Sequence, residues 1–198
     1  MLKRLIDIAA SGALIVLLLP VGVLVGLAVL LFNGRPVLYR QTRVGRGGRP
    51  FQLWKFRSMR PGSGSESQIT HGASDPRITG LGRSLRRLKL DELPQLVNVF
   101  KGDMSLVGPR PEVPRYILPD DERQRRVLQV RPGLTDLNIL RGHFDEAALL
   151  EGQPNPEEYY VRVLVPRKLE LNVEYVDNQS LWLDCKILLG TLAQFPRR

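Results

Sequence analysis

The sequence has few of the residues that form disulfides or zinc sites. It contains one cysteine, Cys185, and two histidines. A single cysteine excludes an internal disulfide and favours a reducing compartment. With no cysteine cluster and so few histidines, a zinc site is not expected. The sequence also lacks an internal repeat, and its 198 residues fit one modest domain plus a membrane segment.

Acidic residues are scarce in the first half of the chain. Between Asn33 and Lys89 only Glu66 and Asp75 are acidic, whereas arginine and lysine recur throughout this stretch. The whole chain carries a formal net charge of +9 and has a pI near 10.2. Such a balance points to an anionic partner, and nucleic acid, anionic lipid and phosphorylated substrates all qualify.

Charge is absent from Ile8 to Phe32, a run of 25 residues. As a helix this run rises about 37 Å, which exceeds the hydrocarbon thickness of about 30 Å. A cleaved secretory signal is disfavoured, because the run is longer than such segments and no small-residue cleavage site precedes Asn33. We therefore expect a membrane segment that stays in the mature protein.

Pro20 lies near the middle of this run, where it removes one helical hydrogen bond at a cost of about 3 kcal/mol. Divided there, each half rises only about 18 Å, too little to cross a bilayer alone. Positive charge favours the cytoplasmic side, and basic residues flank both ends at Lys3, Arg4, Arg35, Arg40 and Arg43. We predict a re-entrant helix-break-helix with Pro20 at the break. Near its mouth Asp7 can pair with Lys3 or Arg4, and we expect all three residues to anchor the end of the helix.

Two adjacent carboxylates, Asp91 and Glu92, precede apolar residues at helical spacing, namely Leu93, Leu96, Val97 and Phe100. Pro94 is tolerated only in a first helical turn, so the pattern predicts Asp91 as the N-cap and Glu92 as the first helical residue. A helix N-terminus favours an ionised carboxylate by a few tenths to about 1 kcal/mol. Asp91 is then expected to be charged and nucleophilic. The alternative is that Asp91 only caps its helix.

The remaining pattern indicates an α+β fold that is mainly helical. Residues 37–39 and 51–56 predict two short strands around a glycine-rich bend at residues 45–48. Residues 82–90 predict a helix with a basic face, which by default is a solvated surface. Near the C-terminus, apolar spacing predicts an amphipathic helix that lies in the membrane interface or against the core; its apolar residues are Leu181, Cys185, Leu188, Leu189, Leu192 and Phe195.

Arg110 lies between two prolines, Pro109 and Pro111, in a loop that begins at Val107. The prolines restrict the backbone and would hold the guanidinium in one direction, which suits a bidentate phosphate contact. The alternative is a surface loop in which Arg110 pairs with Asp103.

Several ordered motifs carry a resemblance to a known family. They are Tyr39–Gly45, Phe51–Met59, Asp75–Thr79, Asp91–Leu96 and its continuation Asn98–Pro111. Together they resemble the bacterial sugar transferases, the monotopic phosphoglycosyl transferases that begin assembly of polyprenol-linked glycans. The resemblance covers roughly residues 1–115 and resumes at about Lys168–Leu189, so it is far more specific than one short motif.

The resemblance implies transfer of a sugar 1-phosphate from a UDP-sugar to undecaprenyl phosphate, with release of UMP and with Mg²⁺ as cofactor. Asp91 would be the nucleophile and a Mg²⁺ ligand, and Glu92 would position the metal or accept a proton. The residues expected to bind substrate are Lys55, Arg57, Arg86, Arg110 and Arg141.

The resemblance also implies a location and a domain organisation. Residues 1–33 would form the re-entrant hairpin in the bacterial inner membrane, and residues 34–198 a catalytic domain on its cytoplasmic face, with interfacial amphipathic helices. Anionic phospholipid is an expected partner and nucleic acid is not. No oligomeric state is predicted.

The match to the family weakens in places. Lys89 stands where the family often has serine, and residues 136–142 depart from the family pattern. Two alternatives to the enzyme therefore remain at this point. One is a membrane-anchored basic module that binds nucleic acid or acidic partners, and the other is an inactive scaffold for glycan enzymes.

Overall fold

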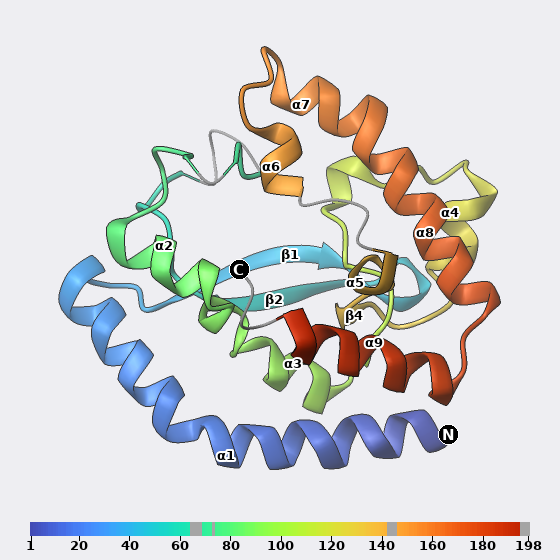
Figure 1. Cartoon of the computed structure of the whole chain (residues 1–198), viewed down its shortest axis with the longest axis horizontal. Helices are drawn as coiled ribbons and strands as arrows, with labels where there is room; N and C mark the ends of the chain where they lie inside the picture. The colour runs from blue at the N-terminus through green and yellow to red at the C-terminus, as the bar shows by residue number, and fades with distance from the viewer. Residues whose placement is uncertain (64–68, 73, 142–145, 195–198) are drawn as a thin grey trace.

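A two-stranded antiparallel hairpin occupies the centre of the protein in a computed structural model, which describes residues 1–63, 69–72, 74–141 and 146–194 (Figure 1). The hairpin comprises β1 (Leu38–Val44) and β2 (Pro50–Phe56), paired from Leu38 with Phe56 to Val44 with Pro50. Gly47 and Gly48 take positive φ values in the bend, as glycine readily does. The predicted hairpin is confirmed, and its strands are longer than the apolar pattern indicated.

Helices surround the hairpin. Along the chain these are α1 (Leu2–Asn33), α2 (Gly80–Arg87), α3 (Gln95–Lys101), α4 (Glu122–Val127), α5 (Asn138–Arg141), α6 (Glu146–Leu150), α7 (Pro156–Tyr159), α8 (Val165–Asp177) and α9 (Leu181–Gln194). In Figure 1, α1 runs along the lower edge, α3 lies between α1 and the hairpin, and α8 and α9 lie at the right. The mainly helical fold class is confirmed.

A second pair of strands, β3 (Ser105–Val107) and β4 (Gly133–Thr135), was not predicted. The two strands are parallel, with Ser105 opposite Gly133 and Val107 opposite Thr135. Parallel pairing joins segments far apart in the chain, and three-residue strands give too little alternation to be found from sequence.

Helix α1 is one hydrogen-bonded helix that continues through Pro20. The prediction of two separate helices is therefore wrong, because backbone hydrogen bonds form one continuous helix on both sides of Pro20. Proline removes one donor, and neighbouring hydrogen bonds carry the helix past it, commonly with a bend. Figure 1 shows the helix changing direction part-way along its length.

Most of α1 is exposed and apolar. Over its most apolar 18-residue window the mean hydropathy is 3.1, and only 11% of the window is buried, whereas the core helix of a soluble protein is mostly buried. Among the described residues it is the one helix long and apolar enough to span a membrane. Its composition and exposure fit contact with lipid.

The N-terminal end of α1 is fastened to the rest of the protein. The buried Asp7 accepts hydrogen bonds from Ser105 Oγ and Leu106 N on one carboxylate oxygen, both at 3.0 Å, while Lys3 Nζ lies 2.6 Å from Asp184. Arg4 donates to the carbonyl oxygens of Val99 and Phe100. Within the described residues Asp7 pairs with neither Lys3 nor Arg4, and each of these charges bonds to a distant element instead. The expectation that all three anchor the end of the helix is confirmed.

The C-terminal end of α1 is fastened by Arg57, which is only 4% exposed. Its guanidinium donates to the carbonyl oxygens of Asn33, Gly34 and Arg35, and Asn33 donates back to the Arg57 carbonyl at 3.2 Å. Because a helix leaves its last carbonyl groups unpaired, a buried arginine at this position satisfies several of them at once. Both ends of α1 are thus bound to the same domain.

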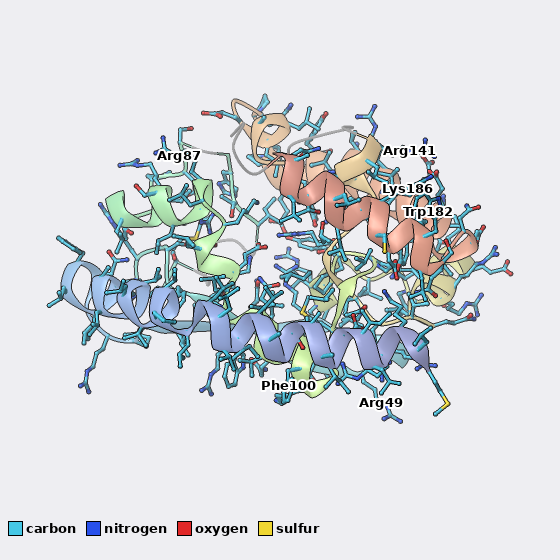
Figure 2. All side chains as sticks on the ribbon, turned by 60° about the horizontal axis from the view of Figure 1, so that its bottom comes forward. Arg49, Arg87, Phe100, Arg141, Trp182 and Lys186 are labelled. Atoms are coloured by element: carbon cyan, nitrogen blue, oxygen red, sulfur yellow. The ribbon has the colours of Figure 1, made fainter. Side chains whose placement is uncertain are left out.

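Helix α9 presents an apolar face that nothing in the described chain covers. It buries Asp184 and Ile187, whereas Trp182 is 69% exposed, with Lys186 Nζ over its ring at 5.1 Å (Figure 2). Of the apolar residues expected on one face, Leu188 is partly buried, Phe195 lies outside the described residues, and the exposed ones are Leu181, Cys185, Leu189 and Leu192. The predicted helix is confirmed, but its contact with a membrane stays a prediction.

Asn98, which is only 1% exposed, fastens α3 to the hairpin. Its Oδ1 accepts from Trp54 N at 3.1 Å, and its Nδ2 donates to Gln52 O at 2.8 Å. Asn98→Ala should lower the free energy of unfolding by about 1–3 kcal/mol, because two partly buried backbone groups lose their partners. Denaturant unfolding in detergent measures this loss. Gln52→Ala is the control, since among the described residues that side chain bonds Thr42 alone, at the exposed surface. An equally small effect of both changes would contradict the role of Asn98 in fastening α3 to the hairpin.

Candidate active site

Asp91 and Glu92 lie in a 3₁₀ turn, Leu90–Glu92, that connects α2 to α3. Glu92 N donates to Lys89 O, and Leu93 N donates to Leu90 O, so these bonds span three residues. The prediction that Asp91 is an N-cap is wrong: its side chain caps nothing, and α3 begins only at Gln95. Pro94 has no N–H to donate to Leu90, which favours the tighter turn before the α-helix.

Glu92 joins two cations from different parts of the chain. Its Oε1 accepts from Lys55 Nζ on β2 at 3.0 Å and from Arg110 Nη2 at 2.9 Å. Burial alone would raise the pKa of Glu92, but Lys55 and Arg110 hold this pKa well below its usual range. The alternative pairing of Arg110 with Asp103 is wrong, since Asp103 contacts Asn98 and Lys101.

Asp91 is buried, being 4% exposed, yet its carboxylate accepts no hydrogen bond and forms no ion pair within the described part of the chain. Burial raises the pKa of this carboxyl, and the charges of Lys55 and Arg86 only partly oppose the shift. This direction is opposite to that expected from a helix N-terminus. The two neighbouring carboxylates therefore differ, because Glu92 is paired and Asp91 is available.

Lys55 and Arg86 flank the carboxylates from two further elements. Burial lowers the pKa of Lys55, although Glu92 partly restores it. Arg86, in the last turn of α2, donates from Nε to Ser58 Oγ at 2.9 Å and from Nη1 to Thr70 Oγ1 at 3.1 Å. Burial also lowers the pKa of Arg86, and the charge of Asp91 is the largest influence that opposes this shift. The structure thus brings Lys55, Arg86 and Arg110 to the two carboxylates.

Two residues that were predicted to bind substrate, Arg57 and Arg141, contact other parts of the protein. Arg57 binds the end of α1, as above, and Arg141 pairs with Glu174. Arg141 is on α5, which packs against α9, and Figure 2 shows it at the surface on the same side as Trp182 and Lys186. The structure does not bring either arginine to Asp91 or Glu92.

Sequence reasoning missed a buried ion-pair network behind the Arg110 loop. Glu112 Oε2 lies 2.8 Å from Lys168 Nζ and accepts from Tyr160 OH at 2.8 Å, while Arg43 Nη1 donates to Pro111 O at 2.9 Å. Burial would raise the pKa of Glu112, but Lys168 and then Arg43 hold it below its usual value. The network holds both sides of the loop in place. Glu112 follows directly after the Pro-Arg-Pro motif, and this position was the one sequence feature that could have indicated its role.

A Mg²⁺ site can be tested against these donors. The described residues contain no cluster of three or more histidine, cysteine or acidic side chains placed to hold a metal. Mg²⁺ is commonly held by one or two carboxylates together with substrate phosphates and water. The unpaired carboxylate of Asp91 fits that arrangement, whereas Glu92 is already occupied by two cations.

Comparison with known proteins agrees with the motifs. The chain is 39% identical over 196 residues to the UDP-glucose:undecaprenyl-phosphate glucose-1-phosphate transferase of Caulobacter vibrioides, covering 96% of this chain and 68% of the relative. The protein with the same name from Escherichia coli is 35% identical, over 97% of this chain and 39% of its own length.

A relative with another sugar in its name is the UDP-N-acetylgalactosamine-undecaprenyl-phosphate N-acetylgalactosaminephosphotransferase of Aeromonas hydrophila. It is 34% identical over 96% of this chain and 43% of its own length. The chain thus spans less than half of the Escherichia and Aeromonas relatives. The family described as bacterial sugar transferase matches residues 1–198, so the chain that brings Lys55 and Arg110 to Glu92 belongs to the bacterial sugar transferase family.

Proposed function

We propose that the protein transfers a sugar 1-phosphate from a UDP-sugar to undecaprenyl phosphate, which yields undecaprenyl-diphosphate-sugar and UMP. The observation that carries the proposal is the unpaired, buried carboxylate of Asp91 beside cations that Glu92 holds together. Relatives named as undecaprenyl-phosphate sugar phosphotransferases support the reaction class.

Asp91 acts as the nucleophile. One of its carboxylate oxygens attacks the phosphorus that carries the sugar, and the bond from that phosphorus to the bridging oxygen of the diphosphate breaks. UMP leaves with the bridging oxygen, and an aspartyl phosphosugar remains. An oxygen of undecaprenyl phosphate then attacks the same phosphorus, the carboxylate of Asp91 leaves, and the enzyme is restored.

The cations lower the cost of bringing a carboxylate to a diphosphate. Lys55 and Arg110 bond one oxygen of Glu92, so both positive groups are held close together at the residue that follows Asp91. Arg86 adds a third positive charge near Asp91. Preorganised cations of this kind stabilise developing charge on a transferring phosphoryl group. Mg²⁺ held by Asp91 and the donor phosphates would neutralise further phosphate charge.

The pairing of Glu92 favours neither of the two roles left open by the sequence, metal positioning and proton acceptance, because its Oε1 already bonds two cations. A carboxylate with a strongly lowered pKa is a weak proton acceptor at neutral pH, and Glu92 is such a group. We therefore assign Glu92 to the positioning of Lys55 and Arg110 rather than to proton transfer.

The arrangement of α1 supports a re-entrant position in the bacterial inner membrane, with the catalytic domain on the cytoplasmic face. The N-terminal end bonds β3 through Asp7, and the C-terminal end bonds Arg57. A helix that crossed the bilayer straight would place its ends on opposite sides. The exposed apolar faces of α1 and α9, with Lys186 beside Trp182, fit an interface that contains anionic phospholipid.

Asp91→Asn should keep the fold and the affinity for UDP-sugar but lower transfer by at least about 1000-fold, because an amide cannot form the acyl phosphate. The measurement is UMP release by enzyme and UDP-sugar with Mg²⁺ but no acceptor, at enzyme concentrations that reveal one turnover. The wild type should release close to one equivalent and the variant none. If UMP appeared only after undecaprenyl phosphate was added, direct transfer would replace the covalent scheme.

Arg110→Lys should lower kcat/KM by about 100-fold while the protein stays folded. Arg110 uses one nitrogen on Glu92 and keeps its other donors for phosphate, whereas lysine has one ammonium for both tasks. Steady-state assays of UMP release with varied UDP-sugar measure the loss. Arg123→Lys, at an exposed ion pair with Asp121, is the control. Near-normal turnover of Arg110→Lys would assign Arg110 to structure alone.

The re-entrant position predicts that both ends of α1 are accessible from the cytoplasm only. Leu2→Cys and Arg40→Cys, each in a Cys185→Ser background, should resist a membrane-impermeant maleimide in intact cells and react after lysis. Pro20→Leu should shift α1 toward a straight crossing, because the proline that disfavours an uninterrupted helix is gone. Reaction at only one of the two positions in intact cells, with Pro20 present, would contradict the hairpin.

A further inference from the structure

The parallel pair β3 and β4 brings two segments to one edge. Val107 ends β3 and lies opposite Thr135, which ends β4. Gly108 N donates to Thr135 O at 3.0 Å, so the two strands end side by side, and Gly133 N donates to Pro109 O at 2.8 Å, so the chain after Gly108 bends back along β4. The segment that leads to Arg110 therefore lies against β4, and Asp136 follows directly after this strand.

The two backbones approach closely enough to require glycine. A Cβ at Gly133 would lie 2.1 Å from Gly108 N, and a Cβ at Gly108 would lie 2.6 Å from Arg131 O. Any larger residue at either position would push the strands apart. The close crossing therefore holds the residues before Arg110 against β4, and Arg110 in turn reaches Glu92 at 2.9 Å.

Asp136 has one occupied and one available carboxylate oxygen. Oδ1 accepts from Asn138 N at 2.9 Å, whereas no hydrogen bond to Oδ2 is found within the described residues. The preceding residue, Thr135, bonds Thr191 of α9 at 2.8 Å.

The charges around Asp136 belong to the site. Burial raises the pKa of Asp136, and Arg110 is the largest opposing influence. Two other charged groups nearby, Glu146 and Lys168, already pair with each other at 3.2 Å. Asp136 is thus a partly buried acceptor beside the arginine that we assign to the donor phosphate.

We infer that Asp136 accepts hydrogen bonds from hydroxyl groups of the nucleotide-sugar donor, either on the transferred hexose or on the ribose, and so helps to set donor specificity. The inference rests on the proposed donor class. In a donor whose phosphates lie at Arg110, the neighbouring groups on either side are these two polyhydroxylated rings. A carboxylate oxygen with free lone pairs is a strong acceptor for such hydroxyls.

The test compares ratios, which a general loss of activity does not change. Asp136→Asn keeps an oxygen for Asn138 N and replaces the available acceptor with an NH₂ donor. For the wild type and the variant, kcat/KM is measured with UDP-glucose, UDP-galactose and their N-acetylated counterparts, and affinity is measured for UMP and 2′-deoxy-UMP. We expect Asp136→Asn to change either the ratios of kcat/KM among the UDP-sugars or the ratio of affinities for UMP and 2′-deoxy-UMP, by about 10-fold to 100-fold.

Each result has one meaning. A change confined to the hexose ratios assigns Asp136 to the sugar, and loss of the preference for UMP over 2′-deoxy-UMP assigns it to the ribose. If both sets of ratios stay as in the wild type, the inference is overturned even when turnover falls, because Asp136 is then only a counter-ion of Arg110. If the wild type consumes no UDP-sugar, the proposed function fails, and the nucleotide affinities still test Asp136.

Glu146→Gln is the matched control, since it removes another negative charge near Arg110 but alters a carboxylate already paired with Lys168. Its ratios should equal those of the wild type. Asp136→Ser provides a second variant if the asparagine does not fold, because a serine hydroxyl can also accept from Asn138 N. Thermal unfolding of each purified protein establishes that the ratios describe folded enzyme.

Discussion

The site depends on Glu92 holding two cations on one oxygen. Lys55 comes from the hairpin and Arg110 from the loop after β3, so this carboxylate joins segments that approach only in the folded protein. Both pairs are partly buried, so loss of Glu92 would leave two positive charges close together without compensation. Glu92 is therefore needed to keep two like charges together, and α1, the hairpin and the Glu112 network place the elements that carry them.

The pairing of Glu92 leaves its neighbour available. Burial raises the pKa of Asp91, whereas the cations hold that of Glu92 well below its usual range. Two adjacent carboxylates whose environments push their pKa values apart are suited to different tasks. One organises the positive charge, and the other reacts with the phosphorus that this charge attracts.

The sequence predicted what local patterns encode. Alternation and glycines located the hairpin, and ordered motifs located Asp91, Glu92, Lys55, Arg86 and Arg110. It placed the helix start wrongly because apolar spacing does not separate a 3₁₀ turn from the α-helix that follows it. Arg57 was assigned to substrate because its motif was recognised, but which carbonyl groups a buried arginine binds depends on the end of a distant helix. The β3 and β4 pairing and the Glu112 network also join residues far apart in the chain, and no local pattern reports such contacts.

The central claim is that Asp91, rather than Glu92, carries the transferred group. Intact-protein mass spectrometry after incubation with UDP-sugar and Mg²⁺, without undecaprenyl phosphate, followed by peptide mapping, tests it most directly. The account predicts the added mass of one sugar phosphate, located on Asp91 and removed when acceptor is supplied. An adduct on Glu92, or no adduct in enzyme that turns over normally once acceptor is present, would contradict it.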